Sequence, residues 1–268
     1  MSRKTTTLKP INYNAGNIRW YQKELLAEIR EMNTEVKREV AKAIRDNPLA
    51  EDADLAMDAS PVTIIKWLLD ALARKWIDRF INKALPISDV LMNKTQSAVD
   101  RGLLAAARRE SMTINMQWTD AMLEKREAII AENASLIRSI PEKYFTEVEG
   151  MVYRAVARGG DRKMLADEIE RNFGKRHGIT RRRAEFIARD QTRKATSALS
   201  AARQQAVGII EAEWVHGGGG NKPRHSHVEA GRKRTRFKLA DGCLIDGEYI
   251  MPGKLPNCGC VWRPVLPF

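Results

Sequence analysis

The chain has 268 residues, of which 43% are hydrophobic and 30% charged, and its formal net charge is +12. That hydrophobic content is enough for one large domain or two ordinary ones, and no apolar run reaches the roughly 18 residues of a membrane-spanning helix. No apolar segment follows the basic first residues, so we expect no secretory signal. An odd number of cysteines, three, argues against a disulfide framework and for synthesis in a reducing compartment.

The helical part of the chain is predicted to begin after an extended arm at residues 1–16. Residues 17–157 predict a helical bundle or arm. From 17 to about 47 apolar residues recur every three or four positions, which is typical of a helix. The acidic stretch 48–60 predicts a loop, and residues 61–84 predict a second helix with one buried apolar stripe.

Prolines divide the rest of this region. Pro86 should interrupt the second helix, because proline lacks the backbone donor that a helix interior uses. Residues 88–139 then predict two long helices, or one kinked helix, with the least regular part near 111–113. Pro141 should begin a further helix over 141–157, since proline is tolerated in the first helical turn.

The C-terminal part, 161–268, predicts a separate domain. A short helix should end at Gly174 and a loop should follow it, before a basic helix over 180–207. The apolar period then changes to two, which predicts a β-rich tail over 209–268. After a first strand near Trp214, short strands are expected at 235–239, 248–251 and 260–265.

The fold class predicted from these elements is mainly α with a small C-terminal α+β subdomain. An elongated helical N-terminal half should precede a long basic helix that leads into short antiparallel strands.

The positive charge is concentrated in the C-terminal part of the chain. Residues 1–150 carry 23 Lys and Arg against 22 Asp and Glu, whereas residues 151–268 carry 23 against 12. A localised positive field favours a polyanionic partner, most often nucleic acid. A solubilising surface, or a patch that docks on an acidic protein, is the alternative.

The cations that could contact phosphates lie in two runs. They are Arg181, Arg182, Arg183, Arg193 and Lys194 in the predicted basic helix, and Arg232, Lys233, Arg234, Arg236 and Lys238 in the tail. Phosphates require positive groups rather than a particular sequence, so such binding would be nonspecific. Phe237 is the one aromatic residue within the second run, so a solvated face of a docking module is an equal alternative.

The tail also holds the residue types that bind metals. The candidate ligands are His225, His227, Cys243, Cys258 and Cys260. Alternate residues of a strand face the same side, so the His-x-His and Cys-x-Cys pairs could converge on one zinc ion with four N and S ligands. Cys-x-Cys is not the usual zinc-knuckle spacing, and the alternative is two small buried cysteines and a core or capping histidine. The sequence establishes no cofactor. The one candidate that it suggests is a structural zinc ion.

An enzyme is the competing class of function. The candidate residues for a metal-dependent nuclease or an acid–base site are Arg224, His225, His227, Asp241, Asp246 and Glu248. No carboxylate pair shares an element with a histidine at a fixed spacing, and Asp-Gly pairs are typical of turns. We therefore expect no enzymatic activity.

Several short motifs follow one another between residues 160 and 268. Their residues are Ile187, Ala188, Arg189, Trp214, Arg224, His227, Gly242, Cys258 and Cys260. As an ordered set they resemble the phage Mu F-like family of head-morphogenesis or minor capsid proteins. The chain departs from the family pattern at Gly259, where arginine is common, and at Asp190-Gln191, where many members have Thr-Glu.

The resemblance implies a structural minor head protein of a tailed phage. Its partners would be the portal protein and the major capsid or scaffold protein, with packaged or ejected DNA as a further contact and no membrane. The expected location is the virion, and the host cytoplasm during assembly. Two alternatives remain open: a zinc-dependent nuclease or modifying enzyme on a helical arm, and a nonspecific nucleic-acid-binding protein unrelated to virions.

Overall fold

The structure, a computed structural model, is described for residues 6–46, 61–157, 162–218 and 222–266. The predicted loop at 48–60 lies outside these residues. The chain forms two compact units, each built from segments that are separated in the sequence. A helical unit comprises 22–87 and 133–185, and a mixed unit comprises 1–21, 88–132 and 186–268.

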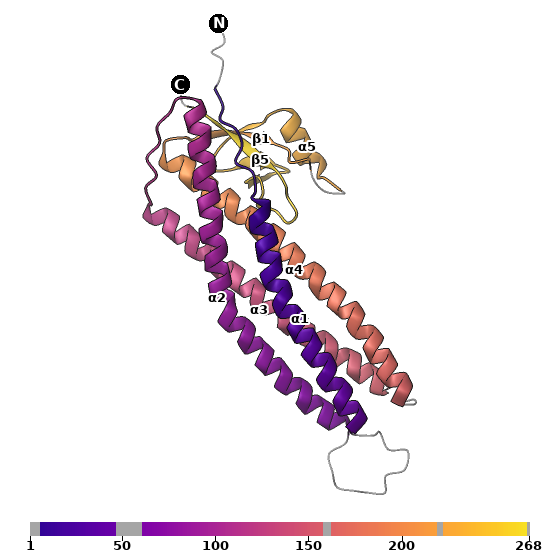
Figure 1. Ribbon diagram of the computed structural model, residues 1–268. Coiled ribbons are helices and arrows are strands. Elements are labelled where there is room, and N and C mark those ends of the chain that lie inside the picture. Colours follow the sequence, from indigo (N-terminus) through magenta and orange to yellow (C-terminus); the bar gives the residue numbers. More distant parts are fainter. Residues whose placement is uncertain (1–5, 47–60, 158–161, 219–221, 267–268) are drawn as a thin grey trace, which may run out of the picture. The chain divides into compact units, whose positions relative to one another are not determined.

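Four long helices supply most of the helical unit and part of the mixed unit, and Figure 1 shows the four helices. They are α1 (Ala15–Asp46), α2 (Pro61–Arg109), α3 (Asp120–Ala157) and α4 (Arg162–Ala206). Each of the four continues from one unit into the other. None of the described helices is both long enough and apolar enough to cross a membrane.

The helical unit buries one apolar stripe from each helix. The fully buried side chains include Leu25, Ile29, Met32 and Val36 of α1, Leu69, Trp76 and Phe80 of α2, Tyr144, Phe145 and Val148 of α3, and Phe173 of α4. Their spacing of three or four residues puts each set on one helix face. The Tyr144 hydroxyl donates to Asn33 Oδ1 at 3.1 Å, so the polar end of this buried ring is satisfied.

The predicted breaks at Pro86 and Pro141 are wrong, because α2 and α3 run straight through both prolines. Ala84 and Ile87, on either side of Pro86, are buried. Ile140 and Tyr144, on either side of Pro141, are also buried. Burial of these stripes outweighs the cost of about 3 kcal/mol that proline carries in a helix interior. The predicted irregular part near 111–113 is confirmed, since α2 ends at Arg109 and α3 begins at Asp120.

The loop expected after Gly174 is also absent: α4 is continuous from Arg162 to Ala206. The basic helix therefore begins well before residue 180. Phe173, Thr180 and Ala184 are buried on one side of α4. A glycine in a helix costs about 1 kcal/mol relative to alanine, which buried contacts on the same face can offset.

The mixed unit contains the strands. They are β1 (Glu211–Val215), β2 (Arg236–Lys238), β3 (Cys243–Ile245), β4 (Glu248–Ile250) and β5 (Val261–Val265). β1 lies between β2 and β5 in an antiparallel sheet, and β3 pairs with β4 in a separate hairpin. The predicted strands at 235–239, 248–251 and 260–265 each contain a strand, whereas β3 was not predicted. The fold class, mainly α with a small region of antiparallel strands, is confirmed.

Two contacts tie this sheet to the rest of the mixed unit. The N-terminal arm extends β5, since Leu8 N donates to Pro264 O at 2.9 Å and Leu266 N donates to Thr6 O at 3.0 Å. Trp262 Nε1 donates to Gln204 Oε1 at 2.7 Å, in the interior between β5 and α4. These contacts fix β5 against the N-terminal arm and against the end of α4.

Candidate functional site

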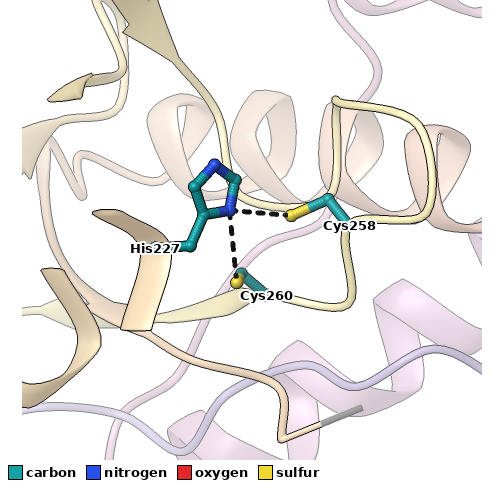
Figure 2. A group of neighbouring side chains, drawn as sticks. All are labelled: His227, Cys258 and Cys260. Atoms are coloured by element: carbon teal, nitrogen blue, oxygen red, sulfur yellow. Dashed lines mark hydrogen bonds between the residues drawn. The ribbon is translucent and has the colours of Figure 1, made fainter. Parts of the chain in front are cut away.

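Three of the predicted metal ligands meet in the mixed unit. His227 Nδ1 lies 3.5 Å from Cys258 Sγ and 3.7 Å from Cys260 Sγ (Figure 2). All three side chains are buried, and their ligand atoms lie within 4.8 Å of one another. We call these three residues the His–Cys cluster.

His227 reaches the cluster from α5 (His225–Arg232). Its ring meets the ring of Trp214 on β1 edge to face, with centroids 5.1 Å apart and an interplanar angle of 82°. The backbone of α5 begins at Arg224, whose carbonyl oxygen accepts from His227 N at 3.1 Å. Packing and helix geometry together therefore aim the imidazole at the two sulfurs.

The cysteines reach the cluster from the loop before β5. Cys258 N donates to Leu255 O at 2.9 Å, which closes a tight turn ahead of the first cysteine. Gly253 N donates to Cys258 Sγ at 3.4 Å. The hydroxyl of Tyr13, in the N-terminal arm, donates to Cys260 O. Nothing in the sequence pattern of the arm pointed to Tyr13.

The structure does not bring all five predicted ligands together. His225 and His227 lie on a helix and not on a strand, so two residues correspond to a rotation of about 200° and place them on opposite faces. His225 is exposed as a result. Cys243 lies on β3, buried in the apolar core outside the cluster, and burial raises the pKa of its thiol.

The two clustered cysteines have opposite ionisation behaviour. The pKa of Cys258 is lowered to about 5, because the Cys260 thiol and the backbone amides of Cys260 and Gly253 donate to its sulfur. The pKa of Cys260 is raised, first because its thiol donates to the Cys258 sulfur, then because the thiol is buried, and also because its ionisation would place a second thiolate beside the first. At neutral pH the pair therefore carries one thiolate, the form of cysteine that binds metals.

The cluster matches the dimensions of a zinc site. Tetrahedral zinc with Zn–S of about 2.3 Å and Zn–N of about 2.0 Å requires a sulfur–nitrogen separation of about 3.6 Å. The measured separations are 3.5 and 3.7 Å. Among the described residues no fourth His, Cys, Asp or Glu joins the group, so the fourth position would fall to water or to another ligand.

An open pocket of about 660 Å³ adjoins the cluster. Cys258, Gly259 and Cys260 form part of its wall, and four cationic residues line it: Arg189, Arg193, Lys222 and Arg224. We call this the basic pocket. Arg224 and Arg193 are anchored at its rim, with Arg224 Nη1 and Nη2 each 3.3 Å from Pro256 O and Arg193 Nη1 3.3 Å from Asn257 O.

Most of the other predicted phosphate-binding cations are already paired with carboxylates. The pairs are Arg181 with Glu185, Lys194 with Glu132 and Asp190, Arg232 and Lys233 with Glu229, and Arg236 with Glu213. Arg183 donates to Ser139 Oγ at 2.8 Å. Arg182, Arg234 and Lys238 are exposed. Of the ten predicted residues, the structure places Arg193 alone in the basic pocket.

The family-motif residues divide into core and pocket. Ile187, Ala188 and Trp214 are buried. Gly242 has φ +92°, a left-handed conformation that favours glycine. Arg189 and Arg224 line the basic pocket.

The carboxylates of the enzyme alternative stand apart from the cluster. Asp241, Asp246 and Glu248 lie in and beside the β3–β4 hairpin and are exposed. None of the three belongs to the His–Cys cluster. Asp190, one of the departures from the family pattern, contacts the loop before β5: its Oδ1 accepts from Asn257 N at 3.2 Å.

The fold and the site define a helical protein with a small strand-containing domain closed around a buried His–Cys cluster. Residues 146–263 match the model of the phage Mu protein F like proteins. This part of the chain is therefore similar to that family, a family of phage head-morphogenesis proteins.

One relative matches over nearly the whole chain. It comes from Haemophilus influenzae and is described as an uncharacterized protein. The alignment of 268 residues shows 30% identity and covers 96% of this chain and 55% of the relative. The chain thus spans about half the length of the curated relative that it matches. No solved structure matches the chain.

Proposed function

We propose that the protein is a structural minor head protein of a tailed phage, which acts in procapsid assembly at the portal vertex and contacts DNA. The observation that carries this proposal is the family match over residues 146–263. The spatial arrangement of the motifs supports it, because Arg189, His227 and Cys260 come from α4, α5 and the loop before β5 and gather around one small region.

The two parts of the chain suit different partners. Residues 1–150 are close to neutral and supply most of the long helices, whose exposed faces can dock on the portal protein and on the capsid or scaffold protein. Residues 151–268 carry nearly all of the excess positive charge, which suits contact with DNA. The protein would reside in the virion after assembly in the host cytoplasm.

We further propose that the His–Cys cluster holds a structural zinc ion. His227, Cys258 and Cys260 would bind it and so fix α5 to the loop before β5. The region around them is small, with three-residue strands, and such regions gain stability from a metal. Metal binding would also displace the remaining thiol proton of the cysteine pair.

One observation favours a second candidate function, a zinc-dependent hydrolase. Three protein ligands leave a fourth coordination position, which in catalytic zinc sites holds the reacting water. Cys258 and Cys260 also line the basic pocket, where an anionic substrate would be held. Release of nucleotides from DNA by the purified protein, abolished by a chelator and restored by zinc, would establish this alternative.

The test of the main proposal is co-purification from cells that produce the phage. Affinity-tagged protein at its native locus is recovered during head assembly, and the eluate is identified by mass spectrometry. The proposal expects portal protein, with capsid or scaffold protein, in excess over an untagged control. Recovery of DNA and zinc without any head protein would contradict it.

A further inference from the structure

We propose that the basic pocket binds consecutive phosphate groups of a DNA strand, independently of base sequence. The residues that would contact the phosphates are Arg189, Arg193, Lys222 and Arg224. This inference rests on the DNA contact proposed above and assigns that contact to a defined place. It replaces the two cation runs that the sequence suggested.

The pocket wall carries a high density of positive charge. Four permanently charged side chains line it, together with His216. No carboxylate is among the lining residues. Asp190 contacts the Asn257 rim, but it is buried, accepts from Asn257 N at 3.2 Å and pairs with Lys194 at 3.3 Å. The charge of the pocket is therefore not neutralised from within.

The arginines differ in how firmly they are held. Arg193 lies over the ring of Tyr13, 5.4 Å from its centroid, and also donates to Asn257 O. Arg224 is held by Pro256 O. Arg189 and Lys222 are exposed and form no ion pair with any described residue. Each guanidinium group can donate to two oxygens of one phosphate. Two anchored guanidinium groups and two free cations therefore suit an anion with several phosphates that extends along the pocket.

The remaining lining residues favour phosphates over an acidic peptide. They include Pro223, Pro256, Asn257 and Gly259, and none of the lining residues is a large aliphatic or aromatic side chain. Peptide recognition normally uses an exposed strand edge or an apolar anchor pocket. Phosphates need only charge and donors, and without an aromatic platform the bases would not be read. The volume of about 660 Å³ accommodates more than one phosphate group.

Gly259 offers a way to change the pocket charge without removing a contact. Its φ lies outside the left-handed region, and a Cβ built on it meets nothing nearer than Arg193 Nη2 at 4.0 Å. A side chain at this position would therefore enter the pocket beside Arg193. Gly259→Glu and Gly259→Gln introduce side chains of nearly the same shape that differ in charge, so this pair isolates electrostatics from shape, and Gly259→Arg introduces the opposite charge.

The experiment measures binding of a short fluorescent DNA duplex, and of one of its strands, by anisotropy over a range of salt concentrations. The full chain is used, and each variant is checked by thermal melting and zinc content. We expect Arg189→Ala/Lys222→Ala to weaken binding equally for unrelated sequences and to reduce the salt slope by about two, or about one per lost phosphate contact. Arg101→Ala/Arg109→Ala removes the same charge from exposed positions on α2 and should leave the slope unchanged.

The Gly259 series gives a second, independent readout. Gly259→Glu should weaken binding by at least about fivefold relative to Gly259→Gln, because like charges repel at the contact. Gly259→Arg should tighten it. Equal DNA affinities of Gly259→Glu and Gly259→Gln would overturn the assignment of DNA binding to the basic pocket. An equal loss of affinity in Arg189→Ala/Lys222→Ala and Arg101→Ala/Arg109→Ala would do the same, and a diffuse DNA contact would remain.

Competition distinguishes the sources of the phosphate groups. Inorganic phosphate should compete only weakly, and a mononucleotide should compete far less than unlabelled DNA. A mononucleotide that binds as tightly as the duplex, or a poly-glutamate peptide that binds while DNA does not, would overturn the assignment to a DNA strand. If the wild-type protein binds no DNA but still co-purifies with head proteins, the DNA contact and this pocket fail together while the head-assembly proposal stands.

Discussion

Gly217 and Gly259 approach each other backbone to backbone: a Cβ built on Gly217 would lie 1.8 Å from the carbonyl oxygen of Gly259. Gly217 follows β1, and Gly259 separates the two clustered cysteines. The end of β1 therefore holds the Cys-Gly-Cys segment in place, and only glycine allows the approach. Gly217 therefore has a packing role at the end of β1.

Gly217→Ala should lower the free energy of unfolding by about 1–3 kcal/mol, the usual cost of overpacking, because backbone atoms must move apart. Gly174→Ala is the matched control, since a Cβ there meets nothing within 4 Å and its helix position favours alanine. Urea unfolding of both variants measures the difference. Equal stability of Gly217→Ala and the wild type would show that the close approach is not a constraint.

Arg203 of α4 is buried and forms an ion pair with the partly buried Asp100 of α2. Arg203 is 3% exposed, its Nη2 donates to Asp100 Oδ2 at 3.0 Å, and its Nη1 donates to Gln117 O at 2.7 Å. The guanidinium also lies over Trp118, 4.6 Å from the ring centroid. Arg203→Met should destabilise the protein by about 1.5–3 kcal/mol, because it removes hydrogen bonds to a charged group and leaves the partly exposed Asp100 carboxylate without its partner.

The double variant Arg203→Met/Asp100→Leu tests the cause of that loss. It removes both charges, so part of the stability should return. Urea unfolding of the two single variants and the double variant gives the coupling energy. If the double variant is as unstable as the sum of the two single variants, the pair does not act as a unit.

The metal prediction concerns the three clustered residues. Purified protein should contain one zinc ion, and cobalt substitution should give the absorption of a tetrahedral thiolate site. Cys258→Ser and Cys260→Ser should each reduce zinc content and melting temperature, whereas Cys243→Ser should keep the zinc, because Cys243 lies outside the cluster. If Cys258→Ser and Cys260→Ser leave both stability and head assembly unchanged, the His–Cys cluster has no structural role.

Zinc affinity can be read from stability as well. A ligand at 100 times its dissociation constant stabilises the folded state by about 2.7 kcal/mol. Chelation should therefore lower the melting temperature of the wild type and leave that of His227→Ala unaffected. If the chelator lowers the melting temperatures of both proteins equally, its effect does not come from metal at the His–Cys cluster.

Alkaline pH should destabilise the fold through buried tyrosines. Burial raises the pKa of Tyr21 and of Tyr144 above the ordinary value of 10.0. A folded-state pKa above the unfolded value contributes stability that is present below about pH 10 and is lost as pH rises beyond it. Urea unfolding between pH 8 and 11 should show this decline, and Tyr144→Phe should reduce it. No decline above pH 10 would mean that these rings ionise freely in the folded protein.

The sequence predicted helices well where apolar spacing was regular, and misjudged where they stop. Pro86, Pro141 and Gly174 each signal a local break, yet buried side chains on either side continue the helix. Local propensity costs at most about 3 kcal/mol at such a position, and tertiary burial exceeds it. Sequence alone does not show which helix face is covered, so these positions could not be assigned correctly.

The candidate site was predicted in part for a similar reason. The cysteine pair and His227 do converge, but His225 does not join them, because residues 225–227 lie on a helix and not on a strand. The basic pocket was missed because it is assembled from α4, the segment before α5 and the loop before β5. Charge runs along the sequence pointed instead to cations such as Arg232, which Glu229 neutralises on the same helix.

The most direct test of the proposed structural role in a phage head is quantitative mass spectrometry of phage heads purified from cells that express this chain. The account predicts that the protein co-purifies with intact heads in a small, reproducible copy number relative to the portal protein, and that heads made without it are defective. Its absence from purified heads, together with normal heads in a deletion strain, would contradict the account.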